Sequence, residues 1–394
     1  MQNKIFTNEE NLLQKGNGNI YMDYQASTPL DPRVLEAMMP FLTYEYGNPH
    51  STEHAYGWRA NDAVEHSKEI ISEYINALPD EIIFTSGATE SNNLAIIGMG
   101  YAALEKSKKR TILVSTIEHK CVLGAARFLE RFGFKIKKIP VLNNGKLDLE
   151  IFNSLINDDV LLVSIMATNN EIGVNQNLSE IGHICKCNDV IFHVDAAQGG
   201  YSNLDVIDNN IDMMSMSAHK IYGPKGIGIL YISQNMGIKP LPIIQGGGQQ
   251  NGYRSGTLPV YLTVGMAKAV EIMKEFKVGE IEQIKSLRDK LLKGLTQIEP
   301  NLKINGDMQD RHPGNLNITL PNQDARELIL SLQPHLAFST GSACTSGIQE
   351  PSHVLKAIGL STTEAERSFR ITVGRFTTEN DIEHIIKYLQ ARYK

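Results

Sequence analysis

The stretch of sequence that decides the fold is MMSMSAHKIYGPKG, residues 213–226. Its first four residues form an apolar run that is too short for a helix and fits a buried strand. Ser217, His219 and Lys220 follow the run. Polar groups at the end of a buried strand are typical of an open parallel sheet, in which ligands bind beyond the carboxyl ends of the strands. Burial lowers the pKa of a lysine, so that more of its amine is in the neutral, nucleophilic form. Lys220 is therefore a candidate for bonding to a carbonyl group, whereas Lys225 fits a solvated turn.

Similar short apolar runs alternate with helical patterns over most of the chain. Several runs are apolar throughout, as expected for strands that are covered on both faces. The alternation predicts an α/β fold with a mostly parallel, seven-stranded sheet and helices on both of its faces. The predicted strands are residues 82–84, 111–115, 135–140, 160–166, 190–194, 213–216 and 227–232, and the clearest helices between them are residues 90–104, 120–132 and 179–188.

The pattern changes after residue 257. A long helix is predicted from residue 260 to about 299, because apolar residues recur there three and four apart. A mixture of shorter helices and strands follows and predicts a smaller α+β domain, with a strand at 315–320, a helix at 325–332 and a strand at 370–373. We therefore expect a flexible N-terminal arm at 1–19, a large domain at 20–260 and a small domain at 261–394, with residues 20–30 packing against the small domain.

The composition excludes several classes of protein. The chain has 394 residues, 42% of them hydrophobic, which is enough for a large core. The 38 Lys and Arg against 44 Asp and Glu give a net charge of −6 and argue against a DNA-binding protein. No segment resembles a secretory signal or approaches the roughly 18 apolar residues of a membrane span. Four cysteines argue against a disulfide framework and favour a reducing compartment, so we expect a cytoplasmic protein.

Three further segments carry residues suited to chemistry, and each also has a plainer interpretation. Residues 85–90 read TSGATE and run into a helix, which fits either a phosphate site at a helix N-terminus or an ordinary capped helix start. Asp195 ends an apolar strand, where it suits a metal ligand, a base, a counter-ion or a helix cap. The three glycines at 246–248 lack the strand–loop–helix frame of a phosphate cradle, so a mobile loop is expected there.

Of the four cysteines, Cys344 is the candidate for chemistry. It lies in a Gly- and Ser-rich segment, STGSACTSG, that predicts an accessible, flexible setting, and thiolate reactivity needs access. The other three, Cys121, Cys185 and Cys187, are expected only to pack. His183, Cys185 and Cys187 alternate on a predicted helix, where residues two apart do not share a face, so no three-ligand metal site is expected.

Taken together and in this order, these motifs resemble those of the pyridoxal-phosphate-dependent cysteine desulfurases of the class-V aminotransferase group, in particular the iron–sulfur-assembly branch. The resemblance implies the fold-type I architecture of pyridoxal-phosphate-dependent transferases. Ala218 and Ala197 depart from it, since the family has Gly and Thr at these positions. The resemblance rests on ten separated segments: residues 21–29, 47–51, 85–92, 118–120, 169–173, 193–198, 217–228, 254–257, 341–346 and 370–377.

The resemblance implies a site for pyridoxal 5′-phosphate. Lys220 corresponds to the lysine that bonds to the cofactor, Asp195 to the partner of the pyridine nitrogen, and His119 to the imidazole that stacks on the ring and carries protons. The remaining roles, carried over in the same way, are Gln198 at the ring hydroxyl, Asn170 at the ring and the substrate, Arg370 at the substrate carboxylate, Ala88, Thr89, Ser217 and His219 at the phosphate, and Thr257 at the phosphate of the neighbouring subunit. The last of these implies a homodimer with shared sites.

The sulfur chemistry falls to Cys344 in the same resemblance. It implies that L-cysteine becomes L-alanine while its sulfur is transferred to Cys344 as a persulfide, a step that requires a thiol as the attacking group. Lys220 would remove the α-proton of the substrate. The persulfide sulfur would pass to an iron–sulfur scaffold or another acceptor protein. No resident metal is implied, although Cys344 would suit a transient iron–sulfur ligand.

Two other functions remain open at the level of the sequence. One is a selenocysteine lyase or another class-V pyridoxal-phosphate enzyme, which relative rates on cysteine and selenocysteine would distinguish. The other is a catalytically silent adaptor of an iron–sulfur assembly complex. The intact set of Lys220, Asp195, His119, Arg370 and Cys344 speaks against the adaptor.

Overall fold

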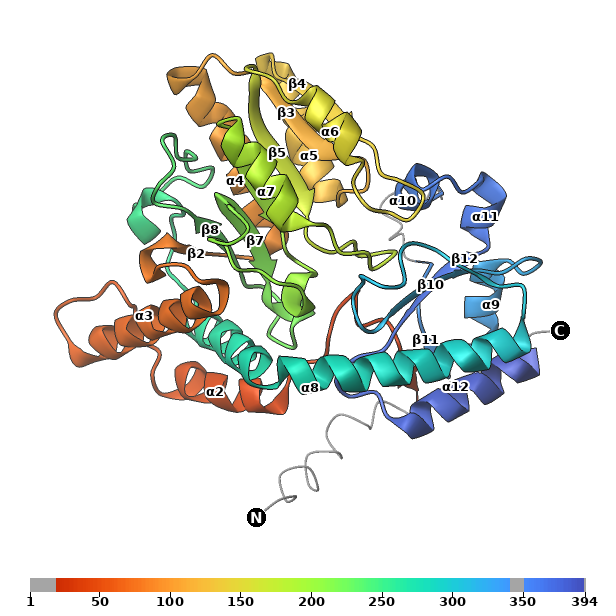
Figure 1. Cartoon of the computed structure of the whole chain (residues 1–394). Coiled ribbons are helices and arrows are strands. Elements are labelled where there is room, and N and C mark those ends of the chain that lie inside the picture. The colour runs from red at the N-terminus through yellow and green to blue at the C-terminus, as the bar shows by residue number, and fades with distance from the viewer. Residues whose placement is uncertain (1–18, 341–350, 393–394) are drawn as a thin grey trace.

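The computed structural model describes residues 19–340 and 351–392, and its centre is one large sheet (Figure 1). Seven strands form this sheet in the order β2-β8-β7-β6-β5-β3-β4. The strands from β4 to β7 are parallel to one another, whereas β8 is antiparallel to both β7 and β2. The prediction of a mostly parallel sheet is confirmed. The strands are β2 (Ile82–Thr85), β3 (Thr111–Ser115), β4 (Lys135–Ile139), β5 (Val160–Met166), β6 (Ile191–Asp195), β7 (Met213–Ser217) and β8 (Gly228–Ile232).

Helices cover both faces of this sheet (Figure 1). Ile83 belongs to the apolar core shared with α4 (Ala88–Lys106) and α5 (Lys120–Leu129), whereas its neighbours Ile82 and Phe84 belong to the core on the other face. Alternation between two apolar cores explains why such strands read as continuous apolar runs. The other face is packed by α2 (Pro32–Thr43), α3 (Ala55–Ile75), α6 (Leu149–Leu155) and α7 (Leu178–Cys187).

A single helix, α8 (Val260–Ile298), connects this core with the C-terminal part of the chain. It packs against α2 and α3 along its first half and against α12 farther on (Figure 1). A third apolar core gathers around the antiparallel sheet β12-β10-β9. The remaining elements are β9 (Lys303–Ile304), β10 (Asn315–Thr319), α9 (Ala325–Ser331), β11 (Leu336–Ala337), α10 (His353–Ala357), α11 (Thr362–Glu366), β12 (Ser368–Thr372) and α12 (Glu379–Arg392).

The N-terminal segment of the described chain joins this C-terminal part. Strand β1 (Ile20–Tyr21) pairs in parallel with β11, and Met22 is buried in the third core. The predicted arm at 1–19 lies, apart from Asn19, outside the described residues, and so does Cys344. Within 19–340 and 351–392, no helix has both the length and the apolar character to cross a membrane.

Candidate active site

The predicted site residues gather at one edge of the large sheet. Strands β2, β3, β5, β6 and β7 share one direction, so their carboxyl ends meet at this edge. Ligands of open parallel sheets bind at such an edge. The residues that follow those five ends are Thr89 in the first turn of α4, His119 before α5, Asn170 after β5, Asp195 at the end of β6 and Ser217 at the end of β7.

Lys220 lies in a short 3-10 turn, Ala218–Lys220, that continues directly from β7. Its Nζ donates hydrogen bonds to the main-chain oxygens of Gln25, at 2.7 Å, and Ala26, at 2.8 Å. Desolvation, together with the nearby charge of Arg370, lowers the pKa of Lys220 to about 8. At pH 7 about one amine in ten is then unprotonated, far more than for an ordinary lysine. Lys220 is therefore suited to act as a nucleophile and as a base.

Asp195 is a buried carboxylate that is held on both oxygens. Its Oδ1 accepts a hydrogen bond from the backbone of Ala197 at 3.0 Å, and its Oδ2 accepts one from Asn92 Nδ2 at 2.7 Å. Burial raises the pKa of Asp195, while the two hydrogen bonds and the nearby His119 and Lys220 act in the opposite direction. A cation beside this carboxylate would offset the cost of its burial.

His119 is the N-cap of α5, and its contacts define its protonation state. Its Nδ1 accepts the backbone N–H of Cys121 at 3.2 Å, so the neutral ring carries its proton on Nε2. The ring is exposed at the site, yet partial desolvation lowers its pKa below that of an ordinary histidine, against the charge of Asp195. A neutral imidazole with one bare and one protonated nitrogen is suited to carry protons.

Cys121 lies at the site, a contact that the sequence did not predict. Its Sγ is 3.0 Å from His119 Nδ1 and accepts from Asn92 Nδ2 at 3.1 Å. Burial raises the pKa of the Cys121 thiol to about 12, so the sulfur stays protonated at neutral pH. Cys121 therefore helps to position His119 but is a poor nucleophile.

The N-terminus of α4 provides an opening suited to an anion. Gly87 caps the helix with a φ of 146°, a conformation that an L side chain rarely adopts. Ser217 Oγ lies 3.8 Å from the position where a Cβ on Gly87 would be, so the helix start faces the end of β7. Free backbone N–H groups and the helix dipole favour negative charge at such a point.

Of the two other residues predicted to bind phosphate, His219 lies in the site of its own chain, whereas Thr257 does not. His219 is half-buried, its Nδ1 is 3.2 Å from Ser27 Oγ, and desolvation together with the charges of Lys220 and Lys225 lowers its pKa to about 4. It is therefore a neutral hydrogen-bonding group at physiological pH. Thr257 is exposed and has no place in the site of its own chain as described.

A partly buried ion pair joins the segment before Thr257 to the start of α4. Arg254 Nε lies 2.9 Å from Glu90 Oε1, and Glu90 Oε2 accepts the backbone N–H of Ser86 at 2.8 Å. The Glu90 carboxylate is one-tenth exposed, so water screens this pair little. The two candidate phosphate-binding segments are thus fixed relative to each other.

Arg370, on β12, brings the C-terminal part of the chain to this edge. Its Nη2 donates to Asp23 Oδ1 at 2.6 Å and to Ser339 Oγ at 3.0 Å, and its Nη1 donates to the main-chain oxygen of Asn170 at 2.6 Å. Its Nε is buried and has no hydrogen-bond partner among the described residues. The guanidinium is therefore oriented and still has a donor to offer to a carboxylate.

Residues 23–28 form a wall of the site that sequence analysis left without a role. Gln198 Nε2 donates to the Gln25 carbonyl at 2.7 Å, the same oxygen that accepts from Lys220. Asp23 pairs with Arg370. Both Asp23 and Gln25 stand in a segment that resembles the family motif, and this was the signal that could have identified them.

One buried carboxyl group, of Glu171, and one main-chain oxygen, of Glu118, anchor the residues that follow the Cys344 segment. Ser352 Oγ donates to Glu171 Oε2 at 2.5 Å, and His353 Nε2 lies 3.0 Å from the main-chain oxygen of Glu118. On the other side of the segment, Ser339 and Arg370 exchange backbone hydrogen bonds of 3.2 and 2.7 Å. Cys344 itself lies outside the described residues, but the chain enters and leaves its segment beside the site.

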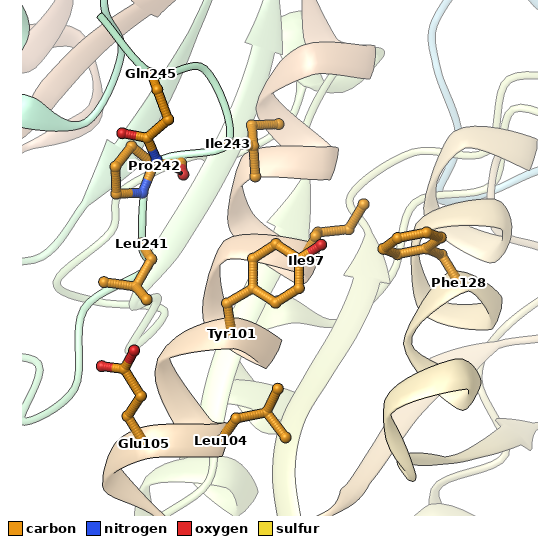
Figure 2. A pocket seen from close by; sticks show the side chains of 9 residues that line it. All are labelled: Ile97, Tyr101, Leu104, Glu105, Phe128, Leu241, Pro242, Ile243 and Gln245. Carbon is orange, nitrogen blue, oxygen red and sulfur yellow. Dashed lines mark hydrogen bonds between the residues drawn. The ribbon is translucent and has the colours of Figure 1, made fainter.

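An apolar groove on the outer side of α4 is separate from this site (Figure 2). None of its lining residues is a predicted site residue, and Glu105 is its one charged residue. Figure 2 shows Tyr101 and Phe128 facing the segment Leu241–Ile243 across it. None of its lining side chains is cationic, whereas Arg and Lys are the usual partners of a phosphate. Its lining is Ile97, Tyr101, Leu104, Glu105, Phe128, Leu241, Pro242, Ile243 and Gln245.

Comparisons with known proteins agree with this geometry. The sequence profile of the family described as Aminotransferase class-V matches residues 20–385. The chain is 49% identical over 372 residues to a protein of Dictyostelium discoideum named "Probable cysteine desulfurase, mitochondrial", covering 94% of this chain and 82% of that protein. It is 48% identical over 374 residues to "Cysteine desulfurase IscS" of Rickettsia typhi, covering 95% and 90%. A solved structure titled "NIFS-LIKE PROTEIN" superposes with a TM-score of 0.88 at 35% identity, covering 95% of this chain and 98% of that one.

Proposed function

Because this chain belongs to the class-V aminotransferase family, and because its Lys220 combines a desolvated amine with His119, Asp195 and Arg370 at one edge of the sheet, we propose that it is a pyridoxal-phosphate-dependent cysteine desulfurase. It converts L-cysteine to L-alanine and transfers the sulfur to Cys344. The observation that carries this proposal is the position of Lys220, which follows β7 directly at the edge of the sheet where Asp195, His119 and Arg370 gather. Its lowered pKa, about 8, agrees with this role, since an amine needs its free form for such chemistry. Relatives that are 48–49% identical and named cysteine desulfurases support it.

The direct test is to follow the reaction products. Purified protein supplied with pyridoxal phosphate, L-cysteine and a thiol is expected to form L-alanine and sulfide in equal amounts. A faster reaction on L-selenocysteine that does not need Cys344 would instead indicate a selenocysteine lyase. A protein that takes up no cofactor and forms no alanine would indicate a silent adaptor.

The residues at the sheet edge fit pyridoxal phosphate. Lys220 would bond to its carbonyl carbon, the Asp195 carboxylate would neutralise its ring nitrogen, and His119 and Gln198 would contact the ring. The N-terminus of α4, with Ala88 and Thr89, and the groups of Ser217 and His219 would bind the phosphate. When bound, the cofactor supplies an electron sink that stabilises negative charge at the substrate α-carbon. The buried carboxylate of Asp195 and the anion-binding helix end are the observations that suit these two ends of the molecule.

Arg370 would bind the carboxylate of L-cysteine. Its guanidinium is held in place by Asp23 and by the Asn170 carbonyl, and its buried Nε is available as a donor. Since Asn170, Asp23 and Ser339 take three of its donors, the guanidinium would meet the carboxylate with the donors that remain, in a fixed plane that an ammonium group lacks. With the carboxylate held there, Lys220 would be the group that takes the α-proton, on its Nζ.

Cys344 would accept the sulfur. Its thiolate attacks the substrate sulfur, an S–S bond forms, the substrate C–S bond breaks, and the electron pair remains with the substrate, which is protonated to alanine. The overall change is L-cysteine plus a protein thiol to L-alanine plus a protein persulfide, so no external oxidant is required. Ser339 and Ser352, which bracket the segment, contact Arg370 and Glu171 at the site.

The pH dependence of cofactor uptake follows from Lys220. Only the neutral amine attacks a carbonyl carbon, so the rate at which the apoprotein takes up pyridoxal phosphate should rise with pH and level off above about 8, the pKa of Lys220. An ordinary lysine would give a rise that continues toward pH 10. Stopped-flow absorbance of the growing yellow band measures this rate. A half-maximum near pH 10 would contradict the lowered pKa.

Arg370→Lys is expected to weaken the use of L-cysteine. The ammonium keeps the charge but loses the two-donor geometry, so kcat/KM should fall by about 10²-fold, chiefly through a higher KM. Arg131→Ala, which removes a charge from the turn after α5, is the control and should leave KM unchanged. Steady-state kinetics of alanine release measure both. An unchanged KM in Arg370→Lys would remove Arg370 from the substrate site.

The chain would act as a homodimer and pass its sulfur to an acceptor protein. Thr257 is exposed in its own chain, at the end of a segment fixed by a hydrogen bond of 2.8 Å from Gly256 N to Gln249 Oε1. This leaves it available to the phosphate of a second chain. Sedimentation of the holoenzyme should therefore give a mass of two chains, and a single-chain mass would contradict the shared site. We place this activity, with an iron–sulfur scaffold or another sulfur acceptor as partner, in the cytoplasm.

A further inference from the structure

Helix α7 presents a histidine and a cysteine side by side on its exposed face. His183 and Cys187 are four residues apart and therefore project from the same side of the helix. His183 Nε2 lies 3.6 Å from Cys187 Sγ, and both side chains are exposed. Cys185, between them in sequence, is fully buried against the sheet. The prediction that Cys187 only packs is therefore wrong, whereas it holds for Cys185.

The two atoms are within hydrogen-bonding distance of each other, and the same separation suits two ligands of one metal ion. A tetrahedral Zn²⁺ with a Zn–S bond of about 2.3 Å and a Zn–N bond of about 2.0 Å places the sulfur and nitrogen about 3.5 Å apart. The observed 3.6 Å meets this requirement without movement of the backbone. Thiolate and imidazole together are also the donors that thiophilic ions such as Zn²⁺ prefer.

The helix holds both donors firmly. Leu178, Ile181 and Cys185 fix its inner face in the core, and Asn177 caps its first turn. The two donors therefore lose little freedom when an ion binds, because their main chain is already ordered.

The pair is also remote from the active-site edge. Helix α7 follows the carboxyl end of β5 and leads to the amino end of β6, so its last turn lies toward the opposite edge of the sheet. Cys187 stands four residues before Ile191, where β6 begins, whereas Asp195 ends that strand. An ion at this pair would not contact the residues that we assign to catalysis.

We propose that His183 Nε2 and Cys187 Sγ form a surface site for a thiophilic divalent cation of the Zn²⁺ type. No group of three or more His, Cys, Asp or Glu side chains suited to a metal gathers in residues 19–340 and 351–392. In the proposed site, water molecules complete the coordination. Two protein ligands and open positions make this an exchangeable site rather than a structural one. It would take up and release the ion without a change in the fold.

Protection of Cys187 from alkylation tests the site directly. The holoenzyme in a thiol-free reductant is treated with iodoacetamide with and without Zn²⁺, and the modified Cys187 peptide is quantified by mass spectrometry. Zn²⁺ is expected to protect Cys187 in the wild type and in His66→Ala, a control that removes another exposed histidine. It is expected to give no protection in His183→Ala. Alkylation of the Cys344 peptide is quantified separately in the same digest.

Calorimetry gives the second measurement. Titration of Zn²⁺ into the Cys344→Ser protein should show one bound ion per chain that disappears when either His183→Ala or Cys187→Ser is added. Both substitutions are at exposed positions, so the variants should keep the fold and, in the wild-type background, the desulfurase rate. Absence of protection in the wild type, or equal protection in His183→Ala, would overturn the proposal.

Discussion

Replacing Lys220 by alanine is expected to lower the rate of alanine formation from L-cysteine by about 10⁴-fold or more. The variant loses both the amine that bonds to the cofactor and the base that takes the α-proton. The yellow colour of the purified protein should disappear with the activity, since the methyl side chain at position 220 cannot bond to the carbonyl carbon of the cofactor. Absorbance spectra and an alanine assay on the same preparation measure both effects.

The neighbouring Lys225 provides the matched control. It is exposed in the turn that follows, and Lys225→Ala should keep both colour and rate. Circular dichroism of the two variants separates a chemical loss from a folding defect. An active Lys220→Ala protein would refute the assignment of Lys220, whatever its colour.

Replacing Cys344 by serine is expected to lower the formation of alanine and sulfide by roughly 10³-fold or more, because removing a nucleophile from an enzyme costs at least this much. A hydroxyl at this position is almost entirely protonated at neutral pH and is a poor partner for sulfur. Cofactor uptake should be unaffected, because Lys220 and Asp195 are intact. The persulfide itself should be found by alkylation and mass spectrometry on the Cys344 peptide of the wild type.

Cys187→Ser is the control for this variant. It removes another accessible thiol, on α7, and should retain the wild-type rate. If Cys344→Ser still forms alanine and sulfide at the normal rate with a thiol present, the persulfide role of Cys344 is wrong. The peptide on which mass spectrometry finds the alkylated persulfide then identifies the cysteine that accepts the substrate sulfur.

Most elements of the large sheet could be predicted from the sequence because their apolar runs are continuous. The strand at 111–115 and the strand at 160–166 have the predicted bounds, and the long helix after residue 260 ends within one residue of its expected end. The antiparallel direction of β8 could not be predicted, because an apolar run looks the same in either direction. Strand β1 is two residues long and pairs with a strand 316 residues later, so no local sequence pattern predicts it.

Site residues could be predicted from the sequence where polar or reactive side chains directly follow a predicted strand. Lys220, Asp195 and His119 are brought to one edge by the parallel sheet, as the strand ends indicated. Cys121 was misjudged because its neighbours in space, not in sequence, define its role: Asn92 reaches it from α4. The assigned contacts of the site with cofactor and substrate, and the domain boundaries, stay predictions.

The position of residues 20–26 has a consequence for the order in which the protein becomes functional during synthesis. The carbonyl groups that hold Lys220 belong to Gln25 and Ala26. The segment that leads to them pairs with β11 through β1 and with Thr372 of β12 through Asp23. Asp23 pairs with Arg370, 347 residues farther along the chain. At roughly 5–20 residues per second, translation leaves this segment without its partners until β11 and β12 have been synthesised. The large sheet can form earlier, but the pocket around Lys220 closes only when β11 and β12 are in place, and so cofactor capture should begin only after these strands have emerged from the ribosome.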